Sequence, residues 1–313
     1  FCEIINFMGV NKILFIGLSS VGDVVMTTPV LTSLQNEYPE ALFDIVVDKR
    51  GIELYKNFPK LNKLYIKDKD RPLRGAPDLL LRLWKNRYDI IVDVRSDGLA
   101  YLLRAKKRYT KWFSRSYGPH AIEDLMGIIA TLHKDKPIPH TSVWPAERDR
   151  KYAKKEIEVF DNTDLLLAIS TGDSRKPEKT WTTNKFVNLL NKHRDSFTGV
   201  IFLGNSFEAE GTEEVASKID MPYISTIDNS LLEAASLLEK SCLYIGPDSG
   251  LGHIASAVMT PTISFFSLMK PERYRPWGDR AICICGSDND ARNITVDEVS
   301  AAVLSNQKKG GVT

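Results

Sequence analysis

The stretch LYIGPDSGLGH, residues 243–253, joins an apolar strand to a helix through a turn of small residues. We expect the strand to end at Gly246 and the helix to begin near Ser249. The first amide N–H groups of a helix have no intrahelical partner, and the helix dipole makes that end positive. A turn of this kind suits a diphosphate group.

Two glycines follow the turn, Gly250 and Gly252. They weaken the start of a helix, but they let an anionic ligand approach the backbone closely. A helix that is merely capped by Asp248 or Ser249 would have the same geometry. Such a cap does not account for both glycines together with His253, and we therefore favour the diphosphate site.

Outward from this turn, short apolar runs alternate with amphipathic stretches along the whole chain. This alternation is typical of βαβ units and a mostly parallel sheet. Three prolines between residues 137 and 145 mark an extended connector. We predict an α/β protein of two Rossmann-like domains, residues 1–155 and 156–313. The predicted strands are 12–17, 42–47, 64–66, 88–94, 165–170, 199–204, 223–225, 242–246 and 262–266.

The composition is that of an ordinary soluble enzyme, with 43% apolar and 26% charged residues in a chain of 313. A net charge of +2 does not favour a general nucleic-acid binder. No apolar run approaches the roughly 20 residues that span a bilayer, and residues 1–10 lack the basic start of a secretion signal. We expect a cytoplasmic protein with no nucleic-acid partner.

A basic cluster runs from Arg104 to Arg115. Such a cluster can be a solvated surface. It can also be a patch for an anionic acceptor or for an anionic membrane surface. The sequence leaves these alternatives open.

The cysteines include a C-x-C pair within a strand-like run, residues 281–285. A metal site would need further cysteines or histidines at ligand spacing, and the sequence has none. We therefore expect no metal and no other cofactor, and free buried thiols in a reducing compartment. The four cysteines are Cys2, Cys242, Cys283 and Cys285.

The turn after the first predicted strand reads GLSSVGD, residues 17–23. Its glycine spacing is that of a P-loop, but Asp23 stands where the phosphate-binding lysine belongs, so an NTPase is not indicated. The dinucleotide motif G-x-G-x-x-G is also missing. The turn instead presents a carboxylate at a helix N-terminus and at a ligand-binding edge, although Asp23 could simply cap that helix. Pro29 lies within the same predicted helix, where it would kink the helix or fall in an irregular first turn.

Two further loops leave strand ends in the second half. The first, TGDSRKPEKTW at residues 171–181, carries three basic side chains that could bind anionic groups or simply be solvated. The second, LGNSFE at residues 203–208, places Glu208 where it could accept hydrogen bonds from sugar hydroxyls. An acidic residue in a first helical turn is common, so this second signal is weak by itself.

Together these four loops resemble glycosyltransferase family 9, the bacterial lipopolysaccharide heptosyltransferases. The similarity runs from residue 12 to about residue 278. It rests on S-x-x-G-D-x-x-x-x-x-P at residues 19–29, on K-x-W at 179–181, on G-x-x-x-E at 204–208, and on G-x-D-S-G-x-x-H at 246–253. Each motif is short, but their order along the chain makes the resemblance specific.

The resemblance implies a GT-B fold and an inverting, metal-independent transfer of a heptose from ADP-heptose to the lipopolysaccharide inner core. It implies that Asp23 is the general base. It implies a donor site in the second domain, made by Lys179, Glu208, Asp248, Ser249, Gly250, Leu251 and His253. It implies an acceptor site in the first domain, which we assign to Ser20, Gly22, Arg115 and His120. The partners would be a nucleotide-sugar donor and an anionic glycolipid acceptor, with peripheral contact to the inner membrane.

Three other functions stay open at this stage. A GT-B transferase could use another nucleotide sugar for a different surface glycan. A sugar-nucleotide epimerase of GT-B type would share the helix-end diphosphate site and would turn over donor without acceptor. A catalytically silent binding subunit is disfavoured by the acidic and basic residues at the motif positions.

Overall fold

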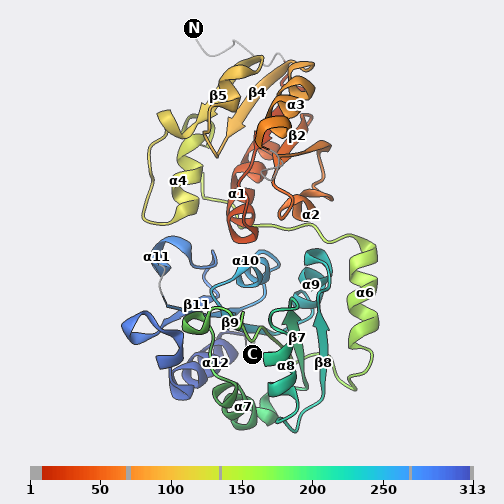
Figure 1. Cartoon of the computed structure of the whole chain (residues 1–313), viewed down its shortest axis with the longest axis vertical. Helices are drawn as coiled ribbons and strands as arrows, with labels where there is room; N and C mark the ends of the chain where they lie inside the picture. The colour runs from red at the N-terminus through yellow and green to blue at the C-terminus, as the bar shows by residue number, and fades with distance from the viewer. Residues whose placement is uncertain (1–8, 68–71, 134–135, 268–269, 311–313) are drawn as a thin grey trace. The chain divides into compact units, whose positions relative to one another are not determined.

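The computed structural model describes residues 9–67, 72–133, 136–267 and 270–310 (Figure 1). The chain divides into two compact units, residues 1–144 and 145–313. This division comes before the predicted boundary at residues 155 and 156. The reason is helix α6 (Glu147–Ile157), which packs against α9 (Leu231–Leu238) and pairs Arg150 with Glu239 at 2.9 Å, so that it belongs to the second unit.

The first unit is built on a five-stranded parallel sheet in the order β3-β2-β1-β4-β5, drawn from red to yellow in Figure 1. Apart from Leu42 at the start of β2, the apolar residues in β1, β2 and β4 are buried, which is typical of strands that are covered on both faces. The elements are β1 (Lys12–Ile16), α1 (Val21–Glu37), β2 (Leu42–Val47), α2 (Ile52–Tyr55), β3 (Leu61–Ile66), α3 (Pro72–Trp84), β4 (Tyr88–Asp93), β5 (Ala105–Thr110), α4 (Ala121–Ile128) and α5 (Ala130–His133). Short 3-10 turns flank β5, namely η1 (Leu99–Leu102) and η2 (Lys111–Phe113).

Helix α1 continues through Pro29. A proline has no N–H group, so the carbonyl of Val25 loses its helical partner there. The hydroxyl of Thr28 donates to that carbonyl at 2.7 Å and replaces the missing bond. The same hydroxyl accepts from the backbone N–H of Ser142 at 2.9 Å, which ties the connector after α5 to the helix.

The second unit is built on a six-stranded parallel sheet in the order β11-β10-β9-β6-β7-β8. Its buried core includes Trp181, which packs edge-on against Phe186 and beside Phe265. In addition to α6 and α9, the elements are β6 (Leu166–Ile169), η3 (Pro177–Lys179), α7 (Thr183–Lys192), η4 (Arg194–Ser196), β7 (Gly199–Gly204), α8 (Ala209–Ala216), β8 (Tyr223–Ile227), β9 (Leu243–Pro247), α10 (Gly250–Ala257), β10 (Thr262–Phe266), α11 (Pro271–Tyr274), β11 (Ala281–Cys285), η5 (Ser287–Asn289), η6 (Ala291–Asn293) and α12 (Val296–Gly310).

Both sheets follow the Rossmann pattern, in which the strand order reverses next to the first strand of each unit. The reversal lies between β1 and β4 in the first unit and between β6 and β9 in the second. Ligands of open parallel sheets bind outside the carboxyl ends of the strands at this point. The topology therefore selects the loops after β1 and β4, and those after β6 and β9, as the places to look for a site.

The predicted α/β class is confirmed, and two details differ from the sequence prediction. Strand β5 was not predicted, because its sequence AKKRYT is basic and lacks an apolar alternation. Cys285 is exposed, whereas Cys242 and Cys283 are partly buried free thiols. Burial raises the pKa of Cys242 to about 11 and that of Cys283 to about 12. Cys2 lies outside the described residues.

Candidate functional site

Asp23 lies in the first turn of α1, beside the strand reversal of the first unit. The helix is capped by Ser20, whose side-chain oxygen accepts from the backbone N–H of Asp23 at 3.3 Å. The same hydroxyl donates to Oδ2 of Asp23 at 2.6 Å. The cap is therefore Ser20 and not Asp23, and the carboxylate is held in place at a positive helix end. Gly22 lies in the same turn.

The loop between β1 and α1 is fixed from the neighbouring strand by Arg95. Its guanidinium donates to the carbonyl of Gly17 at 3.1 and 3.2 Å and to the hydroxyl of Ser19 at 2.7 Å. Arg95 lies two residues after the end of β4, so this contact connects the two loops at the strand reversal. An arginine with several donors holds such a loop more firmly than a single hydrogen bond would.

A buried carboxylate, Asp93, ends β4 at the same place. Its Oδ1 accepts from the backbone N–H groups of Arg95 and Ser96 at 3.0 and 2.7 Å, while its Oδ2 has no partner among the described residues. Burial raises the pKa of this carboxyl. Neither Asp93 nor Arg95 was among the site residues predicted from the sequence. The charged run that follows the apolar strand, VDVRSDG at residues 92–98, is the signal that could have found them.

The two predicted acceptor residues outside this loop, His120 and Arg115, lie near α4. His120 is buried and caps α4. Its ring Nδ1 accepts from the backbone N–H of Ile122 at 3.1 Å, and its backbone N–H donates to the carboxylate of Glu123 at 2.7 Å. Arg115 is exposed on the loop between β5 and α4. Helix capping explains His120 without a ligand, so its contact with an acceptor stays a prediction.

In the second unit, α10 begins at the strand reversal, directly after β9. Ser249 is the N-cap residue, but its side chain makes no capping bond, and its hydroxyl is buried without a partner among the described residues. The amides of Gly250 and Leu251 occupy the first positions of this helix, and His253 is buried one turn later. A helix start with an unused cap hydroxyl can accept an anionic group.

Two glycines around this turn have close side-chain neighbours within the second unit. A Cβ atom on Gly246 would come within 2.4 Å of the hydroxyl of Tyr244, and one on Gly252 within 3.0 Å of Oγ of Ser264. Neighbouring side chains thus already occupy the space beside both positions. Internal packing accounts for the lack of a side chain at these two positions, and the predicted approach of a ligand at Gly252 stays a prediction.

Lys179 and Asp248 meet at this edge of the sheet, with Nζ 3.5 Å from Oδ2. Lys179 ends the short turn η3, and Asp248 follows β9, so the pair connects the crossover after β6 with the start of α10. Burial raises the pKa of the Asp248 carboxyl, and the Lys179 ammonium opposes part of that rise. Trp181 anchors the segment behind Lys179 through its Nε1, which donates to the carbonyl of Ile294 at 2.8 Å.

Glu208 is buried, and the protein itself fills the hydrogen-bonding capacity of its carboxylate. Oε1 accepts from the hydroxyl of Ser170 at 2.6 Å and from the N–H of Gly172 at 3.2 Å. Oε2 accepts from the backbone and side-chain nitrogens of Asn205 at 2.9 and 3.2 Å. A carboxylate offers about four acceptor positions, so Glu208 braces the ends of β6 and β7 against each other. Burial raises its pKa, and these bonds oppose the rise.

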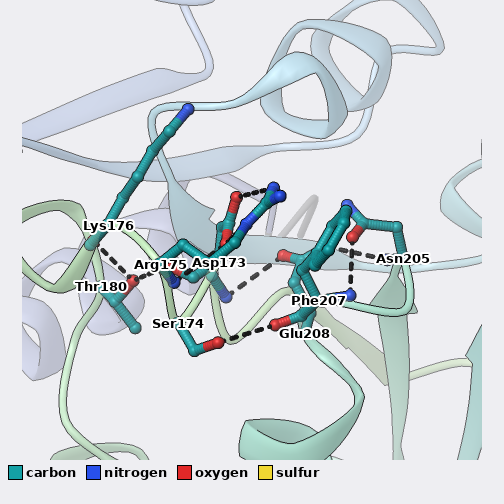
Figure 2. Close-up of polar contacts among 9 residues, drawn as sticks. Asp173, Ser174, Arg175, Lys176, Thr180, Asn205, Phe207 and Glu208 are labelled. Carbon is teal, nitrogen blue, oxygen red and sulfur yellow. Dashed lines mark hydrogen bonds and ion pairs between the residues drawn. The ribbon is translucent and has the colours of Figure 1, made fainter.

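The loop after β6 is ordered by its own side chains, as Figure 2 shows. Asp173 accepts two bonds from the Arg175 guanidinium at 2.8 and 2.6 Å, and Arg175 lies over the ring of Phe207 with its Cζ 3.3 Å from the centroid. The hydroxyl of Thr180 donates to the carbonyls of Asp173 and Lys176 at 3.0 Å. The arginine beside Asp173 lowers the pKa of that carboxyl to about 2. The basic loop is therefore a folded structure that carries Lys179.

Within the described ranges, no group of three or more His, Cys, Asp or Glu side chains is placed to hold a metal ion. Within those ranges also, none of the helices has both the length and the apolar character that crossing a membrane requires. The predicted independence from metal and cofactor stays a prediction.

Comparisons with known proteins agree with this geometry. The model of "Glycosyltransferase family 9 (heptosyltransferase)" matches residues 83–301. Lipopolysaccharide heptosyltransferase 3 of Escherichia coli K12 is 25% identical over 290 residues, which are 83% of this chain and 84% of the relative.

Solved structures match over almost the whole chain. The glycosyltransferase family 9 structure from Veillonella parvula has a TM-score of 0.84 at 19% identity and covers 97% of this chain and 99% of its own. The E. coli heptosyltransferase WaaC with ADP has a TM-score of 0.75 at 19% identity, and the match covers 94% of this chain and 99% of WaaC. The two parallel-sheet units thus have the GT-B fold of heptosyltransferases. Since the family model spans more than half of the sequence, the chain belongs to glycosyltransferase family 9 and is a glycosyltransferase.

Proposed function

We propose that this enzyme transfers a heptose from ADP-heptose to an anionic acceptor of the lipopolysaccharide inner core, either Kdo or a heptose, with inversion and without a metal ion. The observation that carries the proposal is the start of α10, where an unused cap hydroxyl, the first helix amides and the ammonium of Lys179 lie at the strand reversal of the second unit. The E. coli relatives named above are a lipopolysaccharide heptosyltransferase and a heptosyltransferase with ADP.

In this proposal the second unit stabilises the leaving group. Lys179 and the amides of Gly250 and Leu251 bind the diphosphate of the donor, and Asp248 lies beside the sugar. These positive groups are in place before reaction, so they stabilise the charge that develops on ADP as the bond to the anomeric carbon breaks. Ser249 and His253 complete this donor site, and Glu208 forms its wall. A contact of Glu208 with the nucleoside would require the exchange of one of its four present bonds.

The first unit supplies the base in this proposal. The acceptor hydroxyl bonds to the anomeric carbon while its proton passes to Asp23, and ADP departs from the opposite side, which gives inversion. Ser20 holds the carboxylate in a fixed orientation through the 2.6 Å bond. Gly22, Arg115 and His120 are the other acceptor residues that we propose. The reaction requires the acceptor oxygen to reach the donor carbon in line with the leaving oxygen.

We also propose a cytoplasmic location, because Cys242, Cys283 and Cys285 are free thiols, which persist in a reducing compartment. The partners are then the nucleotide sugar and the sugar part of an anionic glycolipid. We propose no nucleic-acid partner, in keeping with the net charge of +2.

The test is incubation with ADP-heptose and truncated core acceptors, followed by mass spectrometry of the glycan. We expect the acceptor to gain one heptose and ADP to be released only when acceptor is present. Donor turnover without acceptor would contradict transfer and would favour an epimerase. A gain of another sugar from a different nucleotide donor would keep the transferase and overturn the heptose. In a crystal grown with ADP, the diphosphate should lie at Ser249–Gly250, and a diphosphate elsewhere would overturn the donor site.

A further inference from the structure

An exposed group of aromatic side chains lies on the first unit, just after the carboxyl end of β5. Trp112, Phe113 and Tyr117 are 62%, 85% and 49% exposed. Together with Lys111 and Arg115, which lie on the same short segment and are also exposed, they form what we call the 111–117 surface. Among the large apolar side chains of the described residues, Phe113 is the most exposed. Exposed aromatic groups of this kind mark interaction sites.

The surroundings of this surface carry only positive formal charge along the chain. No acidic residue occurs between Asp97 and Glu123, and six basic residues do. These are Arg104, Lys106, Lys107, Arg108, Lys111 and Arg115. In the described part of the chain, no acidic side chain lies within ion-pair distance of Lys107, Lys111 or Arg115, whereas Lys106 pairs with Asp89 at 2.7 Å. The surface therefore attracts anions.

The backbone fixes this segment with its aromatic side chains exposed. The N–H of Lys111 donates to the hydroxyl of Ser96 at 2.8 Å, and the hydroxyl of Ser114 donates back to the carbonyl of Lys111 at 2.9 Å. The carbonyl of Arg115 lies so close to Gly127 of α4 that a Cβ atom there would come within 1.8 Å of it. These contacts hold the segment against the body of the unit while leaving Phe113 exposed.

A ring contact orients Trp112 as well. It stacks on Tyr101 with centroids 5.1 Å apart and planes 12° apart, and the hydroxyl of Tyr101 bonds to that of Thr110 at 3.1 Å. One face of the indole is thus supported by the protein, and the side chain as a whole is still 62% exposed. A merely solvated basic surface has no need of three exposed aromatic rings, one of which is held by a ring contact.

We propose that the 111–117 surface docks this protein on an anionic lipid bilayer. The rings of Trp112, Phe113 and Tyr117 enter the interfacial region, which aromatic side chains prefer. Lys111 and Arg115 lie among the lipid phosphates, where each basic residue adds to binding. Paired apolar and cationic groups are what reversible membrane attachment requires, because one kind alone binds weakly.

The docking surface lies at the same edge of the sheet as Asp23. Strands β1 and β5 are separated only by β4, all three are parallel, and Asp23 and the surface follow the carboxyl ends of β1 and β5. A lipid-anchored acceptor would therefore be presented beside Asp23. This consequence rests on the proposed function, whereas docking itself does not depend on which sugar is transferred.

The experiment measures the binding of the full chain to vesicles of phosphatidylcholine with or without phosphatidylglycerol, by flotation. We expect the wild type to bind the anionic vesicles and not the neutral ones. Loss of two charges in Lys111→Gln/Arg115→Gln should weaken the partition coefficient by about 30-fold. Phe113→Ser should weaken it by about tenfold. Brominated lipid should quench the tryptophan fluorescence of the wild type, and much less that of Trp112→Phe.

Matched controls come from the second unit. Lys154→Gln/Lys155→Gln removes two exposed charges of α6, and Val159→Ser removes a side chain that is 68% exposed. Both should bind vesicles like the wild type. Thermal unfolding of every variant should match the wild type, because the substituted side chains are exposed. Salt should weaken the binding, since exposed charges are screened.

Three results would overturn the proposal. The first is equal vesicle binding by wild type, Phe113→Ser and Lys111→Gln/Arg115→Gln. The second is tighter binding of the wild type to a single-stranded oligonucleotide than to vesicles, if the same variants lose that oligonucleotide binding. The third is an equal rise of KM in Phe113→Ser for a water-soluble acceptor and for the same acceptor in vesicles, which would make the surface a sugar-binding site. Failure of sugar transfer with intact vesicle binding would count against the proposed function alone.

Discussion

The strand reversals of the two units are built in different ways. In the second unit, internal contacts occupy the charged groups: Glu208 accepts four bonds, and Lys179 faces Asp248 at 3.5 Å. In the first unit, Asp93 keeps an oxygen without a partner among the described residues, and the carboxylate of Asp23 accepts from the hydroxyl of Ser20. A braced site suits a constant ligand such as a nucleotide, and a less occupied one suits reaction with a variable acceptor.

The largest expected effect comes from removing the carboxylate of Asp23 in the first unit. Asp23→Ala should lower kcat by about 10²–10⁴-fold, because it removes the proposed general base. ADP affinity measured by calorimetry should stay unchanged, since the nucleotide belongs to the other unit. Asp297→Ala is the control, because that acid also lies in a first helical turn and its side chain is 89% exposed. Turnover close to wild type in Asp23→Ala would remove Asp23 from the mechanism.

The next effect tests the bracing of the second unit. Glu208→Ala should lower the free energy of unfolding by about 2–4 kcal/mol, because buried donors on Ser170, Gly172 and Asn205 lose their acceptor. Urea unfolding measures it. Glu214→Ala on α8 is the control, since that side chain is 52% exposed and should change stability little. Equal stability of the two variants would show that Glu208 is not a brace.

A smaller change separates donor binding from stability. Lys179→Met should weaken ADP binding by about 10–100-fold, the usual range for loss of one charged hydrogen bond. Lys176→Met removes an exposed lysine of the same loop and should leave ADP affinity intact. If calorimetry gave the same dissociation constant for both variants, Lys179 would not be a donor ligand.

A substitution in α1 tests the first unit away from its reactive groups. Thr28→Val removes the hydroxyl that bonds to Val25 and Ser142, and should cost about 1–2 kcal/mol of unfolding free energy. Turnover per folded molecule should stay the same. A stable Thr28→Val variant in thermal and urea unfolding would mean that the helix tolerates Pro29 without this bond.

The last prediction concerns pH. Burial raises the pKa of Glu208 above its ordinary value of 4.5, so this carboxyl binds its proton more tightly in the folded protein than in the unfolded chain. The stabilising contribution of the protonated Glu208 carboxyl is complete below pH 4.5 and is lost as the pH rises through the raised pKa. The unfolding free energy of wild type minus that of Glu208→Gln should therefore fall with pH across this window. A difference that is independent of pH would contradict the raised pKa.

Much of the fold could be predicted, because most strands are short apolar runs separated by turn residues. Strand β5 could not, since its side chains Lys106, Lys107 and Arg108 are exposed and leave no buried pattern. The boundary of the units could not either, because the place of α6 depends on its packing against α9, which the local sequence does not contain.

Some residues of the candidate site could likewise be predicted from the sequence, and others could not. Asp23 and the start of α10 could be predicted because their spacing in a strand–turn–helix is local. The bonds that Glu208 accepts from Ser170 and Gly172 could not, because these partners follow another strand, β6. Asp93 was missed although the partners of its carboxylate, Arg95 and Ser96, are close to it in the sequence. The close packing at Gly252 could not be predicted either, since the neighbour beside it, Ser264, belongs to β10.

Strand β5 has one further consequence, because among the described strands it ends the order of its sheet and pairs with β4 alone. A free strand edge offers N–H and C=O groups to which the same edge of another molecule can pair, and proteins crowded on a bilayer would meet often. The lysines of β5 oppose that pairing by charge repulsion, and Arg108 donates to the carbonyls of Ala100 and Leu103, next to the strand. The basic residues of β5 thus act against edge-to-edge pairing, directly before the surface that we propose docks on the bilayer.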